Sequence, residues 1–451
     1  MKCIEDEIPF EVPKGWAWCR LNSIVDVRDG THDTPTYVDK GIPLITSKNL
    51  VEGGIDYSNV KYISEKDAIS INERSGVNIG DILFAMIGTI GNPSMVTEDI
   101  LISIKNVALF KFTFSKNLSN DFVMYFLDYA QEDMKNKPSG GLQPFVSLNF
   151  LRTYLVPVPP VEEQQRIVSI LADSINKIRN IDVLKNELTA SVKKAKSKIL
   201  DLAIRGKLVP QDPNDEPASV LLERIRAEKE ELIKQGKIKR DKKESVIFKG
   251  DDNSYYERVG DIISNIDDEI PFELPQNWEW SRLQTICYPI TDGTHKTPTY
   301  SDSGYIFLSA KNITTGKINW NDIMYIPKSL HDELYSRVSP KMNDILLAKN
   351  GTTGVAAIVD RECEFDIYVT LALLRVVNNN ISSQYLLKII ASDTIQDYFK
   401  SSLKGIGVPN LHLEHIRTTL IPIPPINEQN KIAERIYQYY SLLDSIVQNI
   451  E

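Results

Sequence analysis

The sequence has few of the residues that build metal centres, disulfide frameworks or membrane spans. Its 451 residues include four cysteines and five histidines, and none has the spacing of a zinc site. No apolar run approaches the roughly 18 residues of a transmembrane helix. The acidic residues 1–7 lack the core of a signal peptide. These absences predict a cytoplasmic protein with reduced thiols, without a metal ion and without a membrane anchor.

Catalytic motifs are also missing. The sequence has no P-loop, and no glycine-rich cofactor loop follows an expected strand. The Asn/Asp-Pro-Pro-Tyr/Phe box of methyltransferases is absent, and the nearest approach, residues 92–94, reads Asn-Pro-Ser. Residues 88–91 and 351–354 could cradle a phosphate or form tight turns after a strand. We therefore expect no catalytic residue and no cofactor in this chain.

An excess of positive charge is lacking too. The formal net charge is −9, which argues against a uniformly basic nucleic-acid-binding protein. DNA binding is not excluded, because affinity follows the local electric field rather than the net charge. Basic residues do gather between positions 193 and 243, where solvated helix faces are the alternative explanation.

The chain does contain a second copy of much of itself. Residues 29–37 read Asp-Gly-Thr-His-Asp-Thr-Pro-Thr-Tyr, and residues 292–300 differ from them only by Lys296. The offset between matching positions drifts only from 262 to 265 along the chain. Such a period is far longer than the roughly 20–50 residues of a solenoid repeat, so a whole domain is duplicated. Residues 92–141 and 355–405 share almost no identity, which suggests one scaffold with two specificities.

Two long helices are expected, one after each copy. The proline pair at 159–160 opens the first, in which apolar residues recur over 167–202 with a period near 3.5. The second follows the proline pair at 424–425 and carries an apolar face over 432–450. We expect these seams to pair antiparallel, with the shorter helix covering part of the longer one. Packing of each helix on its own domain is the alternative.

The expected fold is α+β, with two duplicated mixed α/β domains separated by long helices. After the first long helix, the turn-rich residues 210–217 are followed by a helix and then by a charged linker. The expected parts are a first domain at 1–158, a long helix at 159–207, a linker with a second helix at 208–268, a second domain at 269–423 and a C-terminal helix at 424–451.

This order of parts resembles the specificity subunit of type I restriction–modification systems. The resemblance covers essentially the whole chain and rests on the paired Asp-Gly-Thr-His boxes, the paired Lys-Asn dipeptides, the Pro-x-Pro-Pro-x-x-Glu-Gln helix starts at 157–164 and 422–429, and the central residues 206–218. It implies two target recognition domains, joined by an antiparallel coiled coil, that each read one half of a split DNA sequence. It also implies a subunit that catalyses nothing itself.

The resemblance implies partners as well. These are double-stranded DNA, two copies of a modification (methyltransferase) subunit, and restriction subunits. S-adenosylmethionine, ATP and Mg²⁺ are then expected on those partner subunits.

Candidate DNA-binding residues lie at matching positions of the two copies. Lys48 and Lys311 could contact phosphates, and the amides of Asn49 and Asn312 could bond base edges. The alternative is a turn in which the asparagine caps the backbone. Further candidates that could donate to phosphates are Thr31, His32, Thr34 and Tyr37, with Thr294, His295, Thr297 and Tyr300.

Base choice is expected in the unlike stretches, residues 92–145 and 355–410. Candidate readers there are Lys135, Lys137, Gln143, Asn149, Lys400, Lys404 and Asn410. Two other functions are weighed against DNA specificity. One is a bivalent scaffold for protein or carbohydrate, and the other is a self-contained DNA methyltransferase, which the missing cofactor and catalytic motifs disfavour.

Overall fold

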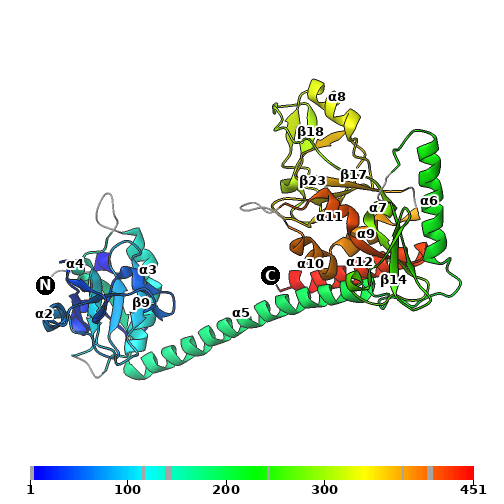
Figure 1. The fold of residues 1–451 in the computed structure, drawn as a ribbon. Coiled ribbons are helices and arrows are strands. Elements are labelled where there is room, and N and C mark those ends of the chain that lie inside the picture. The colour runs from blue at the N-terminus through cyan, green and yellow to red at the C-terminus, as the bar shows by residue number, and fades with distance from the viewer. Residues whose placement is uncertain are drawn as a thin grey trace. The chain divides into compact units, whose positions relative to one another are not determined.

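The computed structural model describes residues 5–113, 117–137, 145–240, 244–377, 380–403 and 410–450. It divides into two compact units, Met1–Val183 and Leu184–Glu451. Each unit holds one copy of the repeat. The helix α5 (Val161–Ile204) runs unbroken from the first unit into the second (Figure 1).

The first copy is built around a four-stranded antiparallel sheet. Its order is β2 (Asp26–Asp29), β11 (Val107–Lys111), β8 (Ile82–Ala85) and β9 (Gly91–Met95). Alternate residues of a strand face opposite sides. Ile82 and Phe84 pack with the helix α3 (Asn120–Asn136), whereas Leu83 and Ala85 pack with Ile45. Burial on both faces explains why β8 reads as an unbroken apolar run.

Smaller sheets and helices complete the first copy. A second sheet has the order β10 (Ser103–Ile104), β4 (Ile42–Ile45), β7 (Lys61–Ile63) and β3 (Tyr37–Val38). Two strand pairs are β1 (Ala17–Arg20) with β12 (Leu155–Val158), and β5 (Leu50–Val51) with β6 (Gly54–Ile55). The remaining helices are η1 (Glu5–Glu7), α1 (Leu21–Ile24), η2 (Ser47–Asn49), α2 (Glu65–Ser75) and α4 (Leu148–Thr153).

The second copy repeats this topology. Its central sheet has the order β17 (Cys287–Asp292), β23 (Leu371–Val376), β20 (Ile345–Ala348) and β21 (Ala356–Ile358). Its other sheets are β19 (Met324–Ile326), β18 (Tyr305–Leu308) and β22 (Phe365–Ile367), and the pair β16 (Glu279–Arg282) with β24 (Leu420–Ile423). Its helices are η3 (Asp267–Glu269), α7 (Leu283–Ile286), η4 (Ala310–Ile313), α8 (Lys328–Arg337), α9 (Ser383–Ile390), α10 (Asp393–Ser401) and α11 (Leu413–Thr418).

The linker contains more structure than the sequence predicted. The helix α6 (Ala218–Lys234) lies where a helix was expected. The stretch that was expected to be a charged linker instead forms a three-stranded antiparallel sheet of β13 (Ser245–Lys249), β14 (Tyr255–Val259) and β15 (Ile262–Asn265). Asn253 and Gly260 adopt the positive φ angles that its two tight turns require.

The helix α12 (Ile426–Gln448) runs antiparallel to the end of α5. Lys196 of α5 forms an ion pair with Asp444, and the Tyr440 hydroxyl donates to the Lys196 carbonyl at 3.1 Å. Just beyond α5, Gln211 donates to Glu428, near the start of α12, at 2.6 Å. The predicted contact between the two long helices is confirmed.

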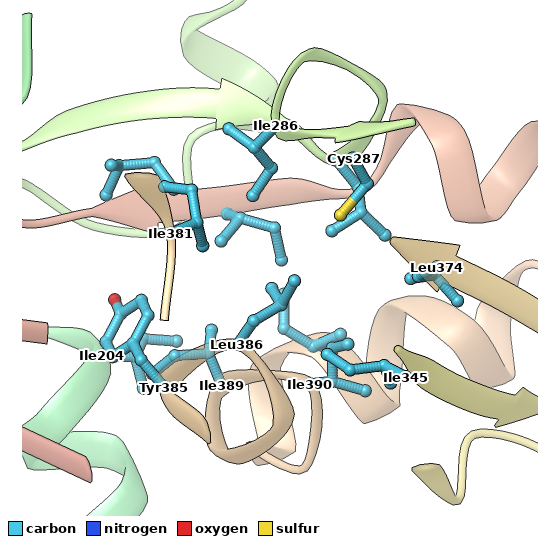
Figure 2. Close-up of a cluster of buried hydrophobic side chains, with 14 of the residues drawn as sticks. Ile204, Ile286, Cys287, Ile345, Leu374, Ile381, Tyr385, Leu386, Ile389 and Ile390 are labelled. Atoms are coloured by element: carbon cyan, nitrogen blue, oxygen red, sulfur yellow. The ribbon is translucent and has the colours of Figure 1, made fainter. Parts of the chain in front are cut away.

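One large core joins these helices to the second copy. Leu200 and Ile204 of α5 belong to the same buried cluster as Ile432 and Ile436 of α12. Figure 2 shows Ile204 near Tyr385 of α9, within this cluster. Burial raises the pKa of the Cys287 thiol, which lies in the same core, and so disfavours its thiolate form.

A buried glutamine fixes the start of each long helix. Gln429 is fully buried: its Nε2 donates to the Pro424 carbonyl at 3.0 Å, and its Oε1 accepts from the backbone of Ser382 at 2.9 Å. Gln164 makes the matching bonds to Pro159 and Ser119, at 2.9 and 2.8 Å. The Glu-Gln of each repeated helix start is therefore a structural joint.

We expect Gln429→Ala to lower the free energy of unfolding of the second unit by about 1–3 kcal/mol, because it leaves buried partners unsatisfied. Denaturant unfolding of the full chain, followed by circular dichroism, measures the change. Gln438→Ala on the same helix is the control, since Gln438 is exposed and donates to the neighbouring Glu434. Equal effects of the two substitutions would contradict the structural role of Gln429.

Candidate nucleic-acid interface

The glycine of each Asp-Gly-Thr-His box allows two backbone segments to touch. A Cβ atom on Gly30 would lie 2.3 Å from the Ile104 carbonyl oxygen, and one on Gly293 would lie 1.8 Å from that of Ile367. The next residue uses the same carbonyl, because the Thr31 amide donates to it at 3.0 Å. Any side chain at either glycine would force these strands apart. Both copies therefore keep glycine at this position because the close approach of the two backbone segments leaves no room for a side chain.

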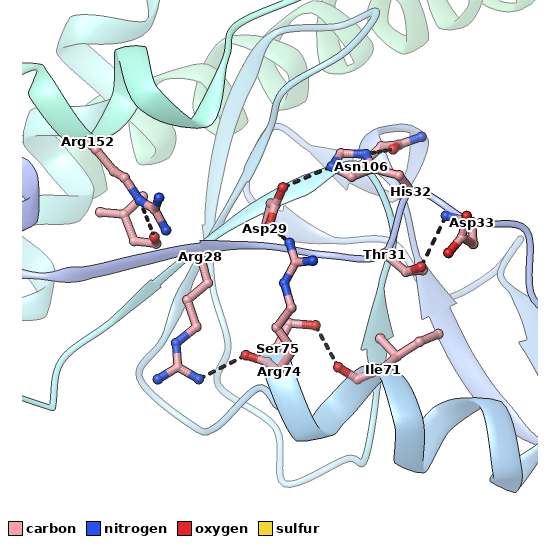
Figure 3. A network of polar contacts seen from close by, with 11 residues as sticks. Arg28, Asp29, Thr31, His32, Asp33, Ile71, Arg74, Ser75, Asn106 and Arg152 are labelled. Carbon is pink, nitrogen blue, oxygen red and sulfur yellow. Dashed lines mark hydrogen bonds and ion pairs between the residues drawn. The ribbon is translucent and has the colours of Figure 1, made fainter.

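The aspartate of each box is a buried carboxylate that orients the histidine. Asp29 forms an ion pair with Arg74, and the Nε2 of His32 lies 2.9 Å from its Oδ2 (Figure 3). His32 Nδ1 lies 2.9 Å from Oδ1 of Asn106. The ring of His32 remains 58% exposed. Each box thus places a histidine at the surface beside a buried charge.

In the second copy, the aspartate of the box pairs with a different cation. Nζ of the buried Lys349 lies 2.6 Å from Oδ2 of Asp292, and Nε2 of His295 lies 3.4 Å from the same oxygen. Lys349 follows β20, whereas Arg74 lies at the end of α2. The shared aspartate thus needs a cation, but either element can supply it.

The asparagines of the Lys-Asn pairs are used inside the protein. The Oδ1 of Asn49 accepts from the Thr46 amide at 3.0 Å, and its Nδ2 donates to the Asp56 carbonyl at 3.2 Å. Asn312 makes the matching bonds to Ser309 and Asp322, at 2.9 and 2.7 Å. Both are buried, so their amides cap a turn, as in the alternative weighed from the sequence. The adjacent Lys48 and Lys311 are exposed.

A groove of about 400 Å³ collects several predicted residues of the first copy. Tyr37, Lys48 and Asn49 line it. Three residues that the sequence analysis did not single out, Lys61, Lys105 and Asn106, line it too. We call these lining residues the first groove.

The basic residues of the first groove contact the box. Lys61 Nζ lies 4.6 Å from the centre of the Tyr37 ring, and Lys105 Nζ donates to Oγ1 of Thr34 at 2.9 Å. Thr31 and His32 belong to the adjoining network of Asp29. Three lysines around one groove create a local positive field in a chain of net charge −9.

The second copy keeps the strand pairing that surrounds the first groove but carries different side chains at several of the matching positions. The strand pairs β7–β4 and β19–β18 place Met324 where the first copy has Lys61. The bridges of Thr31 to Lys105 and of Thr294 to Tyr368 place Tyr368 where Lys105 stands. The Tyr368 hydroxyl lies 3.4 Å from Oγ1 of Thr297. Tyr300, Lys311 and Asn312 are unchanged in type.

The other candidate readers do not line the first groove. Lys135 and Lys137 pair with acids of their own helix, α3, and Lys400 pairs with Asp397 on α10. Asn149 lies on α4, and Asn410 bridges to Asn350. Gln143 and Lys404 fall outside the described residues. Lys105 and Asn106 do lie in the unlike stretch where base choice was expected, but Lys61 does not.

The described residues hold no cluster of metal ligands, and burial disfavours the thiolate form of their cysteines. Those residues contain no group of three or more His, Cys, Asp or Glu side chains that could hold a metal ion. Burial raises the pKa of the Cys19, Cys287 and Cys363 thiols, which lowers their thiolate content. No helix in the described part of the chain is long and apolar enough to span a membrane.

Comparison with known proteins identifies the family. The family model of the type I restriction modification DNA specificity domain matches twice, at residues 13–190 and 275–451. The EcoAI specificity subunit of Escherichia coli is 27% identical over 96% of this chain and 78% of its own length. The MjaVIII specificity subunit of Methanocaldococcus jannaschii is 21% identical over 96% of this chain and 88% of its own.

Solved structures share the fold. The HsdS subunit of Thermoanaerobacter tengcongensis superposes with a TM-score of 0.56 at 17% identity, over 99% of this chain and 94% of its own. A chain from a structure of type I restriction–modification complex assembly gives 0.64 at 16% identity, over 98% and 94%. The chain therefore belongs to the type I restriction–modification specificity subunits, as a non-catalytic DNA specificity subunit with two target recognition domains.

Proposed function

We propose that each recognition domain reads one half of a bipartite double-stranded DNA target through the groove beside its Asp-Gly-Thr-His box. This proposal rests on one observation: the two copies share the backbone arrangement around the groove but differ in the side chains that line it. Lys61 and Lys105 of the first groove correspond to Met324 and Tyr368 in the second copy. A common frame suits the DNA backbone, which is the same at both half-sites, and a variable lining suits two different sequences.

Two classes of contact follow from the side chains. Lys48 and Lys311 are exposed in both copies and suit phosphates. Lys61 and Lys105 suit the acceptors on guanine. Met324 offers an apolar surface of the kind that recognises the thymine methyl group. Asn49 and Asn312 act by holding the turn that presents each lysine.

We also propose that α5 docks a modification subunit. Four apolar residues of its first half are 37–65% exposed, and we call them the α5 stripe: Ile170, Leu171, Ile178 and Ile181. An exposed apolar stripe marks a protein interface. In the complete complex, we assign S-adenosylmethionine, ATP and Mg²⁺ to the partner subunits. These partners are two modification subunits and the restriction subunits.

A bivalent scaffold for protein or carbohydrate is the second candidate considered from the sequence. The three lysines of the first groove favour an anionic ligand instead. Mapping of methylated adenines in a host with and without this chain separates the two. A split motif that disappears on deletion supports DNA specificity, and unchanged methylation supports the scaffold.

Transfer of the second lining to the first groove should change only one half of the motif. The double variant Lys61→Met, Lys105→Tyr carries the matching residues of the second copy, Met324 and Tyr368. We expect genome-wide methylation mapping to show an altered first half-site and an intact second one. Lys135→Met is the control, because Lys135 lies on α3 and pairs with Glu132. An unchanged motif, or changes in both halves, would refute the assignment.

Lys48→Ala should weaken DNA binding without changing the preferred sequence. Removal of one phosphate contact reduces the slope of log affinity against log salt by about 0.9. Fluorescence anisotropy of the assembled methyltransferase on specific and non-specific duplexes measures this slope. A loss confined to the specific duplex would mean that Lys48 reads a base instead.

Ile178→Glu should weaken assembly with the modification subunit by about tenfold, since a charge in an apolar interface costs at least about 1.4 kcal/mol. Titration of the full chain with the modification subunit in a sedimentation experiment gives the affinity. Asn180→Glu adds the same charge on the opposite side of α5 and serves as the control. Equal losses for both variants would place the docking site elsewhere.

A further inference from the structure

An open aromatic pocket lies on the first recognition domain, away from the groove residues. It has a volume of about 570 Å³, and its lining includes Phe10, Trp18, Tyr129, Phe150 and Tyr154, which define the aromatic pocket. The Tyr129 side chain is 75% exposed and that of Phe10 is 49% exposed. The residues of this surface belong neither to the first groove nor to the α5 stripe.

The same surface of the second domain is covered. Phe10 and Trp18 form an edge-to-face pair with ring centres 5.0 Å apart, and the matching Phe272 and Trp280 form a tilted pair with ring centres 5.1 Å apart. Trp280 is only 1% exposed, because the linker sheet β13–β15 packs Ile247 and Tyr255 against it. The first domain has no counterpart of this sheet among the described residues.

An arginine lies at the edge of each surface, and in the second domain it pairs with a carboxylate of the linker sheet. Arg282 donates to Glu257 of β14 through Nε at 3.0 Å and through Nη2 at 2.7 Å, and it also pairs with Glu269. Its Nη1 donates to the Thr418 carbonyl at 2.9 Å. Its side chain is 8% exposed. The cover thus combines aromatic packing with a buried bidentate ion pair.

Arg20 keeps only part of this arrangement. It bonds to Glu7 and to the Thr153 carbonyl, which correspond to Glu269 and Thr418. Among the described residues nothing takes the place of Glu257, no acceptor is recorded for the Arg20 Nε, and its side chain is 32% exposed. One carboxylate position beside the aromatic pocket is therefore open.

The acids of the aromatic pocket do not fill that position. Asp133 accepts from the Tyr154 hydroxyl at 2.8 Å and pairs with Lys137, and Glu132 pairs with Lys135. Arg20 can thus receive a further carboxylate in this pocket.

We propose that the aromatic pocket binds an acidic β-strand segment of a partner protein. The segment presents an aromatic residue to Trp18 and, two residues later, a carboxylate to Arg20. Tyr255 and Glu257 of β14 show this spacing, since residues two apart lie on the same face of a strand. The first domain would thereby acquire from another polypeptide the cover that the second domain receives from its own linker.

A peptide of residues 244–266 is the probe for this surface, titrated by fluorescence anisotropy against the full chain. We expect Arg20→Met in the chain, or Glu257→Gln in the peptide, to weaken binding by about tenfold, the effect of one lost charged hydrogen bond. Tyr129→Ser tests the aromatic side without touching a structural ion pair. Arg166→Met, on the exposed surface of α5, is the control.

A graft provides a second test that does not depend on a free peptide folding. Residues 244–266 replace residues 1–4, because β15 leads into Asp267–Glu269 as the graft would lead into Glu5–Glu7. We expect a higher unfolding temperature of the first unit and a loss of that gain with Arg20→Met. Peptide binding that ignores Arg20 and Tyr129 would overturn the proposal. Absence of peptide binding together with absence of stabilisation by the graft would also overturn it.

Discussion

A buried amide sets the geometry of each half of this protein. Gln164 and Gln429 each tie the first turn of a long helix to the serine that caps a helix of the recognition domain. Both glutamines are buried, so loss of either bond would leave a buried polar group unsatisfied, at about 1–3 kcal/mol. The direction of each helix is thereby fixed to its own domain. A partner that docks on the helix, as proposed for α5, would then act from a defined position relative to the recognition domain.

Duplication works here because backbone-determined positions and ligand-facing positions are separate. Gly30 and Gly293 must be glycine, since the neighbouring carbonyl leaves no room for a Cβ atom. Asn49 and Asn312 hold a turn through both ends of the amide. No such backbone requirement applies to Lys61 and Lys105, and Met324 and Tyr368 occupy their positions in the second copy. The residues at those positions can therefore differ between the copies without altering the fold.

The sequence predicts the duplication, the α+β class and the contact of the long helices, and the structure and the family match confirm them. For Asn49 the sequence left two interpretations open, a DNA contact or a turn cap, and the structure shows that the amide caps a turn. The charged residues before position 268 were expected to form a linker, yet β13–β15 forms there, because strands that short show little alternation against a charged background. The three additional residues of the first groove carried no local signal of their own.

Sequence alone determined what depends on local or periodic patterns: the repeated boxes, the buried strand of residues 82–85 and the seam of α5. Each is decided within a few residues by sterics or by the spacing of apolar side chains. Tertiary structure decided which polar groups meet. The register of β7 against β3 brings Lys61 over Tyr37, and a bridge to Thr31 brings Lys105 beside Thr34. Those encounters depend on pairing between distant segments, which no single stretch of sequence encodes.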